Sequence, residues 1–248
     1  MTKPDRIALV TGGAGGIGAA VCRALAADGR RVAVADLSRD ACDLVAKEVG
    51  GIGVELDVAD PESVAMALEH TRSVLGDPEI VVNVAGWDEH MGFLSTDEAF
   101  TEKVMQINLH GPIRVLRATL PAMAEARWGR VVNIASDAGR VGSSNEAVYS
   151  GAKGGVIAFS KAIAREFARY EITSNTVCPG PTDTPLIHRM IAEQPDADKV
   201  IASMIKAVPM RRMGQPEDLG SAVAFLASEA VGHITGQTLS VSGGLTMI

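Results

Sequence analysis

The sequence predicts a single α/β domain, built as a doubly wound, seven-stranded parallel sheet with helices on both faces. Seven short runs rich in valine and isoleucine lack strict polar alternation, which is typical of strands buried on both faces. Longer amphipathic stretches separate them, and this alternation favours a parallel sheet covered by helices. The expected strands are Ile7–Val10, Val32–Ala35, Gly53–Leu56, Ile80–Val84, Val131–Ala135, Ser174–Cys178 and Thr238–Val241.

The stretches between these runs carry helix signals. Ile17–Ala27 is rich in alanine and follows glycines. Asp60-Pro61 and Gln215-Pro216 each place a polar residue before a proline at the first helical position, and the second of these helices is expected to reach Leu226. Residues 179–214 are the least regular stretch, with an uncertain helix inside, and we expect a substrate lid over about 180–215. No linker or repeat divides the chain, so one domain over residues 1–248 is expected.

Composition excludes several classes of function. The chain has 248 residues, 47% of them hydrophobic, which is enough for a large core without covalent links. A net charge of -7 without a basic run disfavours nucleic acid as a partner. Cys22, Cys42 and Cys178 are far apart, and the five histidines are scattered, so neither a disulfide framework nor a metal site is expected. The chain shows neither a signal-peptide layout nor a membrane-spanning run, which predicts a cytoplasmic protein without a membrane partner.

A glycine-rich turn follows the first expected strand. Thr11–Gly18 reads T-G-G-A-G-G-I-G and leads into a helix. Glycines there let the backbone approach a pyrophosphate, and the helix N-terminus supplies amide donors. Asp36 ends the second strand, eighteen residues beyond Gly18, where a carboxylate can bind the adenosine ribose hydroxyls. Because this carboxylate would repel a 2′-phosphate, the sequence favours NAD over NADP.

Two further segments are candidates for cofactor contact. Asp57-Val58 follows the third strand, where an adenine would lie, although Asp57 can equally be an ordinary helix cap. Asn83–Gly86 ends the fourth strand, and its small residues allow a cofactor to pass over the sheet.

Tyr149, Lys153 and Ser136 are the candidates for chemistry. Tyr149 and Lys153 are four residues apart, which places them on one helical face. A nearby ammonium and an oxidised nicotinamide both favour the phenolate, so we expect a lowered pKa for Tyr149. This spacing alone also fits a surface pair. However, Ser136 ends a strand thirteen residues earlier, where its hydroxyl would point into a ligand-binding crevice.

Over essentially its whole length the chain resembles the short-chain dehydrogenase/reductase family. The resemblance implies a Rossmann fold and an NAD(H)-dependent oxidoreductase that interconverts a secondary alcohol and a ketone. One departure is Val84, where the family often has a second asparagine. The motifs that carry the resemblance are Thr11–Gly18, Asn83–Gly86, Asn108, Ser136, Tyr149 with Lys153, and Pro179-Gly180.

The resemblance also implies roles for single residues. Tyr149 is the general acid/base, Lys153 lowers its pKa and binds the nicotinamide ribose, and Ser136 orients the carbonyl or alcohol. Asn108 positions a water that relays the proton from Lys153. The expected cofactor-binding residues are Thr11, Gly12, Gly16, Ile17, Gly18, Asp36, Leu37, Asp57, Val58, Asn83, Ala85, Gly86, Tyr149, Lys153, Pro179, Gly180, Thr182 and Thr184, the last two holding the carboxamide.

Within the family, the residues resemble those of 2-hydroxycyclohexanecarboxyl-CoA dehydrogenases over 83–88 and 136–144, and residues 146–149 and 178–184 add to the resemblance. This implies a cyclic 2-hydroxyacyl-carboxyl-CoA or 3-hydroxyacyl-CoA type of substrate. The residues expected to contact it are Trp87, Asp88, Asp137, Arg140 and Ser143. Cations around the lid can either meet coenzyme A phosphates or remain solvated; they are Arg189, Lys199, Lys206, Arg211 and Arg212.

Several alternatives stay open. A 3-oxoacyl-(acyl-carrier-protein) reductase shares the scaffold, but such enzymes generally use NADPH and often carry a basic residue where this chain has Ala14 and Gly15. A cyclic secondary-alcohol or sugar-alcohol dehydrogenase is another option. A non-catalytic nucleotide-binding relative is disfavoured, because such proteins usually lose the Tyr or Lys. Family members pair the helices around Phe100–Arg127 and Tyr149–Tyr170, which implies a homotetramer with D2 symmetry.

Overall fold

The computed structural model describes residues 5–192 and 196–248. Its strands form one parallel seven-stranded sheet in the order β3-β2-β1-β4-β5-β6-β7. The predicted fold class is therefore confirmed, and each expected run overlaps a strand. The strands are β1 (Ile7–Thr11), β2 (Arg31–Asp36), β3 (Ile52–Glu55), β4 (Ile80–Asn83), β5 (Gly129–Ile134), β6 (Ile172–Pro179) and β7 (Thr238–Val241).

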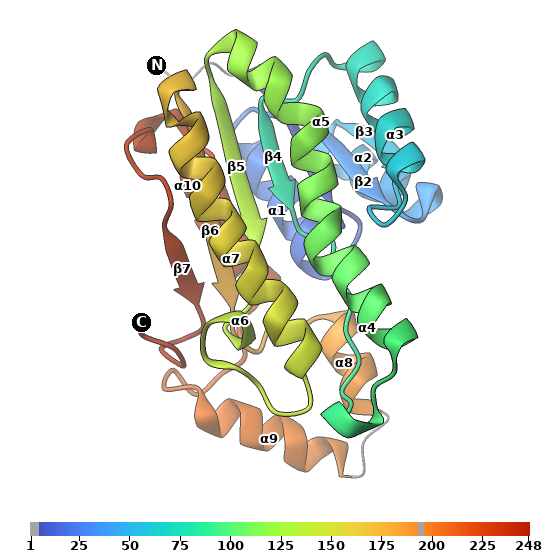
Figure 1. Ribbon diagram of the computed structural model, residues 1–248, viewed down its shortest axis with the longest axis vertical. Helices are drawn as coiled ribbons and strands as arrows, with labels where there is room; N and C mark the ends of the chain where they lie inside the picture. The colour runs from blue at the N-terminus through green and yellow to red at the C-terminus, as the bar shows by residue number, and fades with distance from the viewer. Residues whose placement is uncertain (1–4, 193–195) are drawn as a thin grey trace.

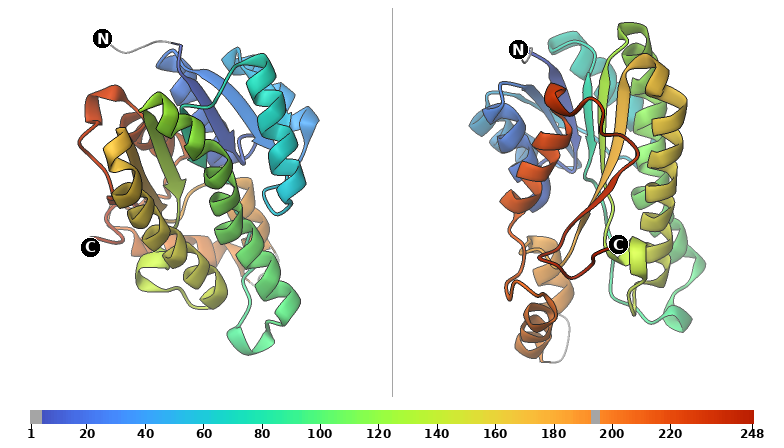
Figure 2. Two further views of the ribbon diagram at one scale, coloured as in Figure 1. Left: turned by 45° about the horizontal axis from the view of Figure 1, so that its top comes forward. Right: turned by 90° about the vertical axis from the view of Figure 1, so that its left-hand side faces the viewer.

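Helices cover both faces of the sheet. Figure 2 (right) shows α1 and α10 on one side of the strands and α5 and α7 on the other. A separate apolar cluster lies beneath each layer, one around Val21 and Leu219 and the other around Leu68 and Leu116. The helices are α1 (Gly16–Ala27), α2 (Arg39–Val49), α3 (Pro61–Val74), α4 (Glu98–Met105), α5 (Gly111–Ala126), α6 (Ala138–Val141), α7 (Ala147–Phe167), α8 (Pro185–Ala192), α9 (Ala197–Ala207) and α10 (Pro216–Leu226).

The strand order reverses beside β1. Thr11 of β1 pairs with Ala35 of β2 on one side and with Asn83 of β4 on the other. The loops that leave these strands run to opposite faces of the sheet, so a crevice opens at their carboxyl ends. In Figure 1 the strand arrows point toward α8 and α9, which lie across this end of the sheet.

The proline signals mark helix starts as expected. The Asp60 side chain accepts a hydrogen bond from the Glu62 amide at 3.0 Å and caps α3. Gln215 and Asp218 form a reciprocal capping box at the start of α10. Since Asp60 is the cap, Asp57 is not: its Oδ1 accepts from the Ala59 amide at 2.8 Å, within the turn before the helix.

Two segments differ from expectation. The helix expected around Phe100–Arg127 is interrupted by a π-helical turn at Gln106–His110. The lid segment is more regular than expected, because α8 and α9 occupy most of it; its residues 193–195 lie outside the described residues. None of the helices in the described part of the chain has the length and apolar character that a membrane crossing requires.

Candidate active site

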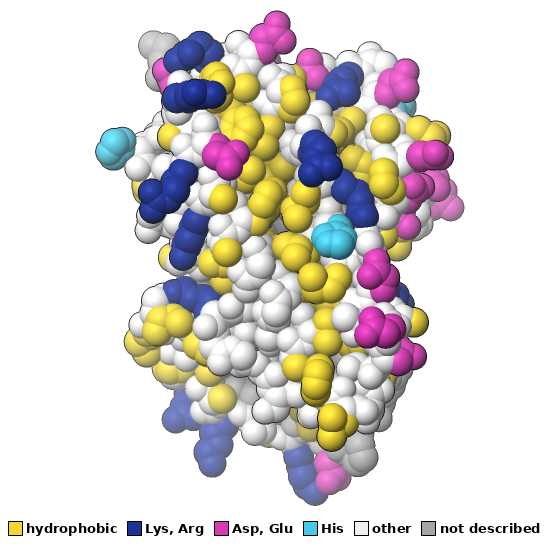
Figure 3. Space-filling model, viewed as in Figure 1, with side chains coloured by type: hydrophobic (Ala, Val, Ile, Leu, Met, Phe, Trp, Pro, Cys, Tyr) yellow, Lys and Arg dark blue, Asp and Glu magenta, His cyan; other side chains and the backbone are white. Residues whose placement is uncertain are grey.

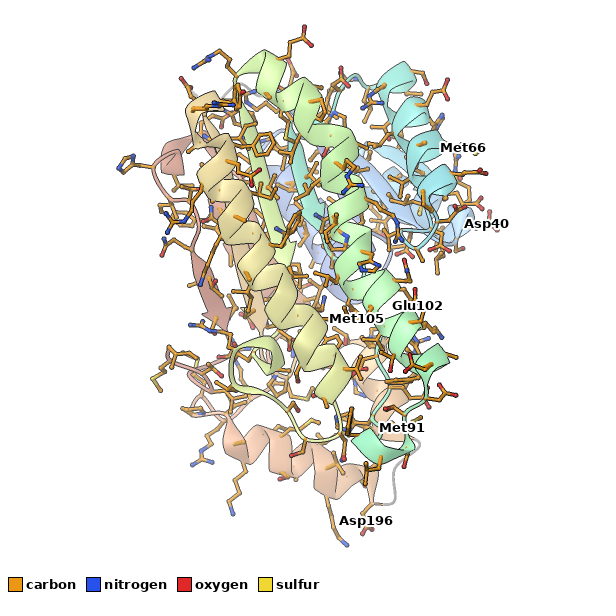
Figure 4. The ribbon with its side chains drawn as sticks, viewed as in Figure 1. Asp40, Met66, Met91, Glu102, Met105 and Asp196 are labelled. Carbon is orange, nitrogen blue, oxygen red and sulfur yellow. The ribbon has the colours of Figure 1, made fainter. Side chains whose placement is uncertain are left out.

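A cavity of about 490 Å³ opens at the carboxyl ends of the central strands. Its walls come from the loops after β4, β5 and β6, from the start of α7, from α8 and α9, and from Leu245 and Thr246 near the C-terminus. Figure 4 shows Met91, in the loop after β4, at this end of the molecule. The cavity thus lies where the strand order predicts a ligand site.

The glycine-rich turn is shaped by close backbone contacts. Gly12 has a φ of +65°, and a Cβ there would lie 2.7 Å from the Ala85 nitrogen. A Cβ on Gly18 would lie 1.9 Å from the Gly12 carbonyl oxygen. Side chains at these two positions would therefore push the turn away from β4 and from the start of α1.

The start of α1 fits a phosphate group. Its N-cap, Gly15, supplies no side-chain acceptor, and the first turn contains no acidic residue. The amides and the positive end of the helix dipole are thus free of competing side chains. A Cβ on Gly16 would lie 3.3 Å from Cγ2 of Thr184, so the loop after β6 stands beside this turn. The residues present fit a dinucleotide bound across the sheet edge.

Asp36 lies beside the glycine-rich turn. Its Oδ2 accepts a hydrogen bond from the Ala14 amide at 3.1 Å, and its Oδ1 accepts from the Leu37 amide at 2.8 Å. The side chain of Leu37 is exposed. These contacts fix a carboxylate at the end of β2, beside the turn expected to hold the cofactor.

The other expected cofactor residues divide into two groups. Pro179, Gly180, Thr182 and Thr184 line the cavity, as does Ile17. By contrast, the buried Asn83 side chain points along the sheet and donates to Oδ1 of Asn133 at 2.8 Å. Thr11 accepts from the Ala85 amide at 3.3 Å, which joins β1 to the loop after β4. Val58 packs against Gly111 at the start of α5.

Ser136, Tyr149 and Lys153 all line the cavity. The Lys153 ammonium is buried, donates to the Ile134 carbonyl at 3.0 Å, and lies 5.6 Å from the centroid of the Tyr149 ring. The Ser136 Oγ accepts from the Ala138 amide at 3.1 Å. The three side chains predicted for chemistry therefore meet in one place.

Asn108 lies behind this group, in the π-helical turn. It is fully buried; its Nδ2 donates to the carbonyls of Trp87 and Val104 at 2.6 and 2.9 Å, and its Oδ1 accepts from the Trp87 amide at 3.2 Å. A Cβ on Gly86 would lie 3.0 Å from Oδ1 of Asn108 and 3.4 Å from Nζ of Lys153. The absent side chain at Gly86 thus lets Asn108 and Lys153 approach the same point.

Burial shifts the pKa values of both Tyr149 and Lys153. Burial, together with the negative charges of Glu146 and Asp88, raises the pKa of Tyr149, although the Ser136 side chain opposes this by hydrogen bonding. Burial lowers the pKa of Lys153 to about 8. The protein's own groups thus favour a neutral phenol, because burial has the largest effect on the pKa of Tyr149.

Four of the five expected substrate residues, Trp87, Asp88, Asp137 and Ser143, line the cavity. Trp87 also packs on Phe100, with ring centroids 5.7 Å apart. Arg140 does not line the cavity: its guanidinium donates to Ser240 Oγ at 2.8 Å and to the Thr238 carbonyl at 3.4 Å, which ties it to β7.

The lid cations do not form a cluster at the cavity. Arg212 pairs with Asp218 at 2.6 Å, and Lys199 pairs with Asp196 at 2.9 Å. Figure 4 shows Asp196 at the outer end of α9. None of the five expected cations is among the described residues that line the cavity. Their position favours ordinary solvated charges.

Several lining residues were not expected from the sequence. His90 and Glu146 lie next to each other on the cavity wall, with His90 Nε2 3.4 Å from Glu146 Oε1. The lid contributes apolar side chains to the cavity. Two of them, Ile187 and Ile191, are four residues apart on α8, and Val200 and Met204 have the same spacing on α9. That spacing is the signal by which the lid helices and their inner faces could have been found.

Comparison with known proteins agrees with this geometry. The family described as enoyl-(acyl carrier protein) reductase matches residues 12–246. Nodulation protein G of Azospirillum brasilense is 39% identical over 247 residues, which cover 97% of this chain and 98% of the relative. The 3-oxoacyl-(acyl-carrier-protein) reductase FabG of Pseudomonas aeruginosa is 38% identical and covers 100% of both chains.

Two further relatives extend the comparison. The acetoacetyl-CoA reductase of Allochromatium vinosum is 38% identical over 250 residues, covering 98% of this chain and 99% of the relative. A crystal structure titled as ribose-5-phosphate isomerase from Brucella melitensis 16M superposes with a TM-score of 0.91 at 33% identity, over 97% of this chain and 91% of that one. The fold and the family likeness therefore extend over nearly the whole chain.

Proposed function

Since this chain belongs to the short-chain dehydrogenase/reductase family and is an oxidoreductase acting on CH–OH groups, we propose that it interconverts a 3-hydroxyacyl thioester and the 3-oxoacyl thioester with NAD(H). The observation that carries the proposal is the meeting of Ser136, Tyr149 and Lys153 in one cavity. Two of the compared relatives are named for 3-oxoacyl and acetoacetyl thioesters. The cyclic substrate 2-hydroxycyclohexanecarboxyl-CoA belongs to the same class, because its hydroxyl is on the carbon β to the thioester.

Tyr149 moves the proton in this proposal. In reduction its phenol donates a proton to the oxygen of the ketone, and in oxidation it removes the proton of the hydroxyl. Burial, which raises its pKa, keeps the phenol protonated and suits the reductive direction. Ser136 holds the same substrate oxygen by a hydrogen bond and orients the reacting carbon.

Lys153 and Asn108 support the proton transfer. Lys153 has its pKa lowered to about 8 and can therefore gain or lose a proton near neutral pH. Asn108 holds the backbone of Trp87 through both ends of its amide, which fixes the loop that begins the substrate wall.

The cofactor in this proposal is NAD, held by the Thr11–Gly18 turn, Asp36 and the loop after β6. When bound, its nicotinamide supplies or accepts the hydride. The Asp36 carboxylate, fixed by two backbone amides, favours ribose hydroxyls and repels a 2′-phosphate.

Initial rates with acetoacetyl-CoA, its acyl-carrier-protein thioester and 2-oxocyclohexanecarboxyl-CoA, each with NADH and NADPH, test the proposal. We expect thioester reduction with NADH, and the ratio of the linear to the cyclic substrate decides which acyl group is preferred. NADPH preference with the carrier-protein substrate would move the chain to the fatty-acid reductases. Turnover only of free cyclohexanone or sugar ketones would overturn the thioester assignment.

We also propose a cytoplasmic homotetramer. Figure 3 shows hydrophobic side chains gathered along the face that α5 and α7 present, which suits the pairing of these helices between subunits. Met247 and Ile248 at the C-terminus are exposed as well and fit a second contact. Light scattering is expected to give four times the chain mass, and a stable monomer would contradict the assembly.

A further inference from the structure

Asp88 is the unexplained group in the cavity. The residue is 6% exposed, and neither carboxyl oxygen makes a well-formed hydrogen bond in the described part of the chain, although the backbone amide of the neighbouring Glu89 is near enough to lower its pKa. A buried carboxyl group that is so weakly hydrogen-bonded is costly, so its retention beside a ligand cavity needs a reason. Asp88 lines the same cavity as Tyr149, and its charge acts on that phenol.

Glu146 extends this acidic wall. It directly precedes α7, lines the cavity, and lies close enough to Asp88 to raise the pKa of that carboxyl. Asp137, on the wall after β5, adds a third carboxyl group, 5% exposed, but its Oδ1 accepts from Ser240 at 2.5 Å. The only buried cation that lines the cavity among the described residues is Lys153, and it donates to the Ile134 carbonyl.

Resting on the proposed function, we propose that Asp88, with Glu146 beside it, is a specificity-determining residue that restricts the cavity to substrates without a negative charge near the reacting carbon. A 3-oxo acid whose carboxyl group is esterified as a thioester meets this condition. The corresponding free acid, by contrast, places a carboxylate against the acidic wall. Like charges in a poorly solvated site repel strongly, so the acid is rejected while the ester enters.

The charge state of Asp88 makes the selection dependent on pH. Burial is the main cause that raises its pKa to about 7, with Glu146 and Glu89 adding to it, while the Glu89 amide and Lys153 oppose it. The carboxyl is therefore neutral at lower pH and negative above about pH 7, so rejection of acids increases as pH rises. The titratable groups that face it are Glu89 and His90 on its own loop and Glu146, Tyr149 and Lys153 at the start of α7.

The test compares ethyl acetoacetate with acetoacetate, which share the reacting ketone. We expect kcat/KM for the ester to exceed that for the acid by about 100-fold at pH 8, as for like charges about 6 Å apart at an effective dielectric constant of about 20. Asp88→Asn is expected to reduce this ratio about 10-fold, mainly by improving the acid, and to remove its rise with pH. Glu89→Gln, which removes the same charge from the exposed neighbouring residue, is the matched control and should leave the ratio unchanged.

A binding measurement separates this inference from the proposed function. Quenching of bound NADH fluorescence by butyramide and by butyrate reports their affinities without turnover. Butyramide should bind at least about 10-fold more tightly, and Asp88→Asn should close the gap. Equal binding of the two, or a gap unchanged by Asp88→Asn, would overturn the inference. Failure to reduce any thioester would overturn only the proposed function.

Discussion

The Nζ of Lys153 lies 5.6 Å from the centroid of the Tyr149 ring, one helical turn along α7. The same ammonium donates to the Ile134 carbonyl, so the end of β5 holds it as well as its own helix. Lys153 is thus a costly buried charge as well as a member of the site, so its substitution should lower activity while it raises stability.

Tyr149→Phe removes only the phenol oxygen. We expect kcat for ketone reduction to fall by about 100- to 10,000-fold, the usual contribution of a positioned acid. Binding of NADH, followed by fluorescence, should be unchanged because the ring stays in place. Turnover within about threefold of the unmodified enzyme would show that another group moves the proton.

Lys153→Met should abolish turnover and stabilise the fold at neutral pH. Burial lowers the pKa of Lys153 to about 8, so below pH 8 the folded protein bears the full cost of holding this charge. After allowing for the lost hydrogen bond, we expect the free energy of unfolding at pH 7 to rise by about 2 kcal/mol. The gain should shrink as pH rises from about 8 toward 10.5, where the unfolded side chain also loses its proton. Urea denaturation at pH 7 and pH 10 measures the gain in stability and its decrease with pH. A loss of stability in the variant at pH 7 would contradict a costly buried charge at Lys153.

Asp36→Asn should relax the choice of cofactor. The ratio of kcat/KM for NAD over NADP is expected to fall by about 10- to 100-fold, because the repelling charge is removed while hydrogen bonding is kept. Asp40→Asn, an exposed carboxylate in the first turn of α2, is the matched control (Figure 4) and should not change the ratio. An unchanged ratio in Asp36→Asn would place the selecting group elsewhere.

Two glycines of one turn should respond differently to alanine. A Cβ on Gly18 would lie 1.9 Å from the Gly12 carbonyl, whereas a Cβ on Gly15 would lie 3.4 Å from that oxygen. Gly18→Ala is expected to lower the free energy of unfolding by about 2 kcal/mol and to weaken NADH binding. Gly15→Ala should leave stability within about 0.5 kcal/mol. Similar thermal unfolding of the two variants would contradict this geometry.

Glu229 should control acid stability far from the cavity. Although burial opposes its ionisation, hydrogen bonds from Arg30 and Arg6 lower its pKa to about 2. Its stabilisation is complete above about pH 5 and is lost as pH falls toward 2. Glu229→Gln should cost about 3 kcal/mol at pH 7 and little at pH 2, as measured by chemical denaturation. A cost that does not change with pH would show a packing effect instead.

The strands and the helix starts could be predicted because their signals are local. Valine-rich runs, the Asp60-Pro61 pair and the Gln215-Pro216 pair each determine structure within a few residues, and spacing alone placed Tyr149 and Lys153 on one face. The position of Arg140 could not be predicted, because the sequence does not show that β7 brings Ser240 to its guanidinium. The effect of burial on the pKa of Tyr149 could not be predicted for the same kind of reason, since burial depends on the packing of distant segments.

The π-helical turn at Gln106–His110 acts as a one-residue insertion between α4 and α5. An α-helix advances by about 100° per residue, so the turn sets the two helices out of phase. Before the turn, Phe100 and Lys103 contact the Trp87 ring. After it, Val115 and Leu116 pack in the core under the sheet. A variant with one residue deleted from this turn would have a continuous helix. It could keep either the contacts with Trp87 or the packing in the core, but not both.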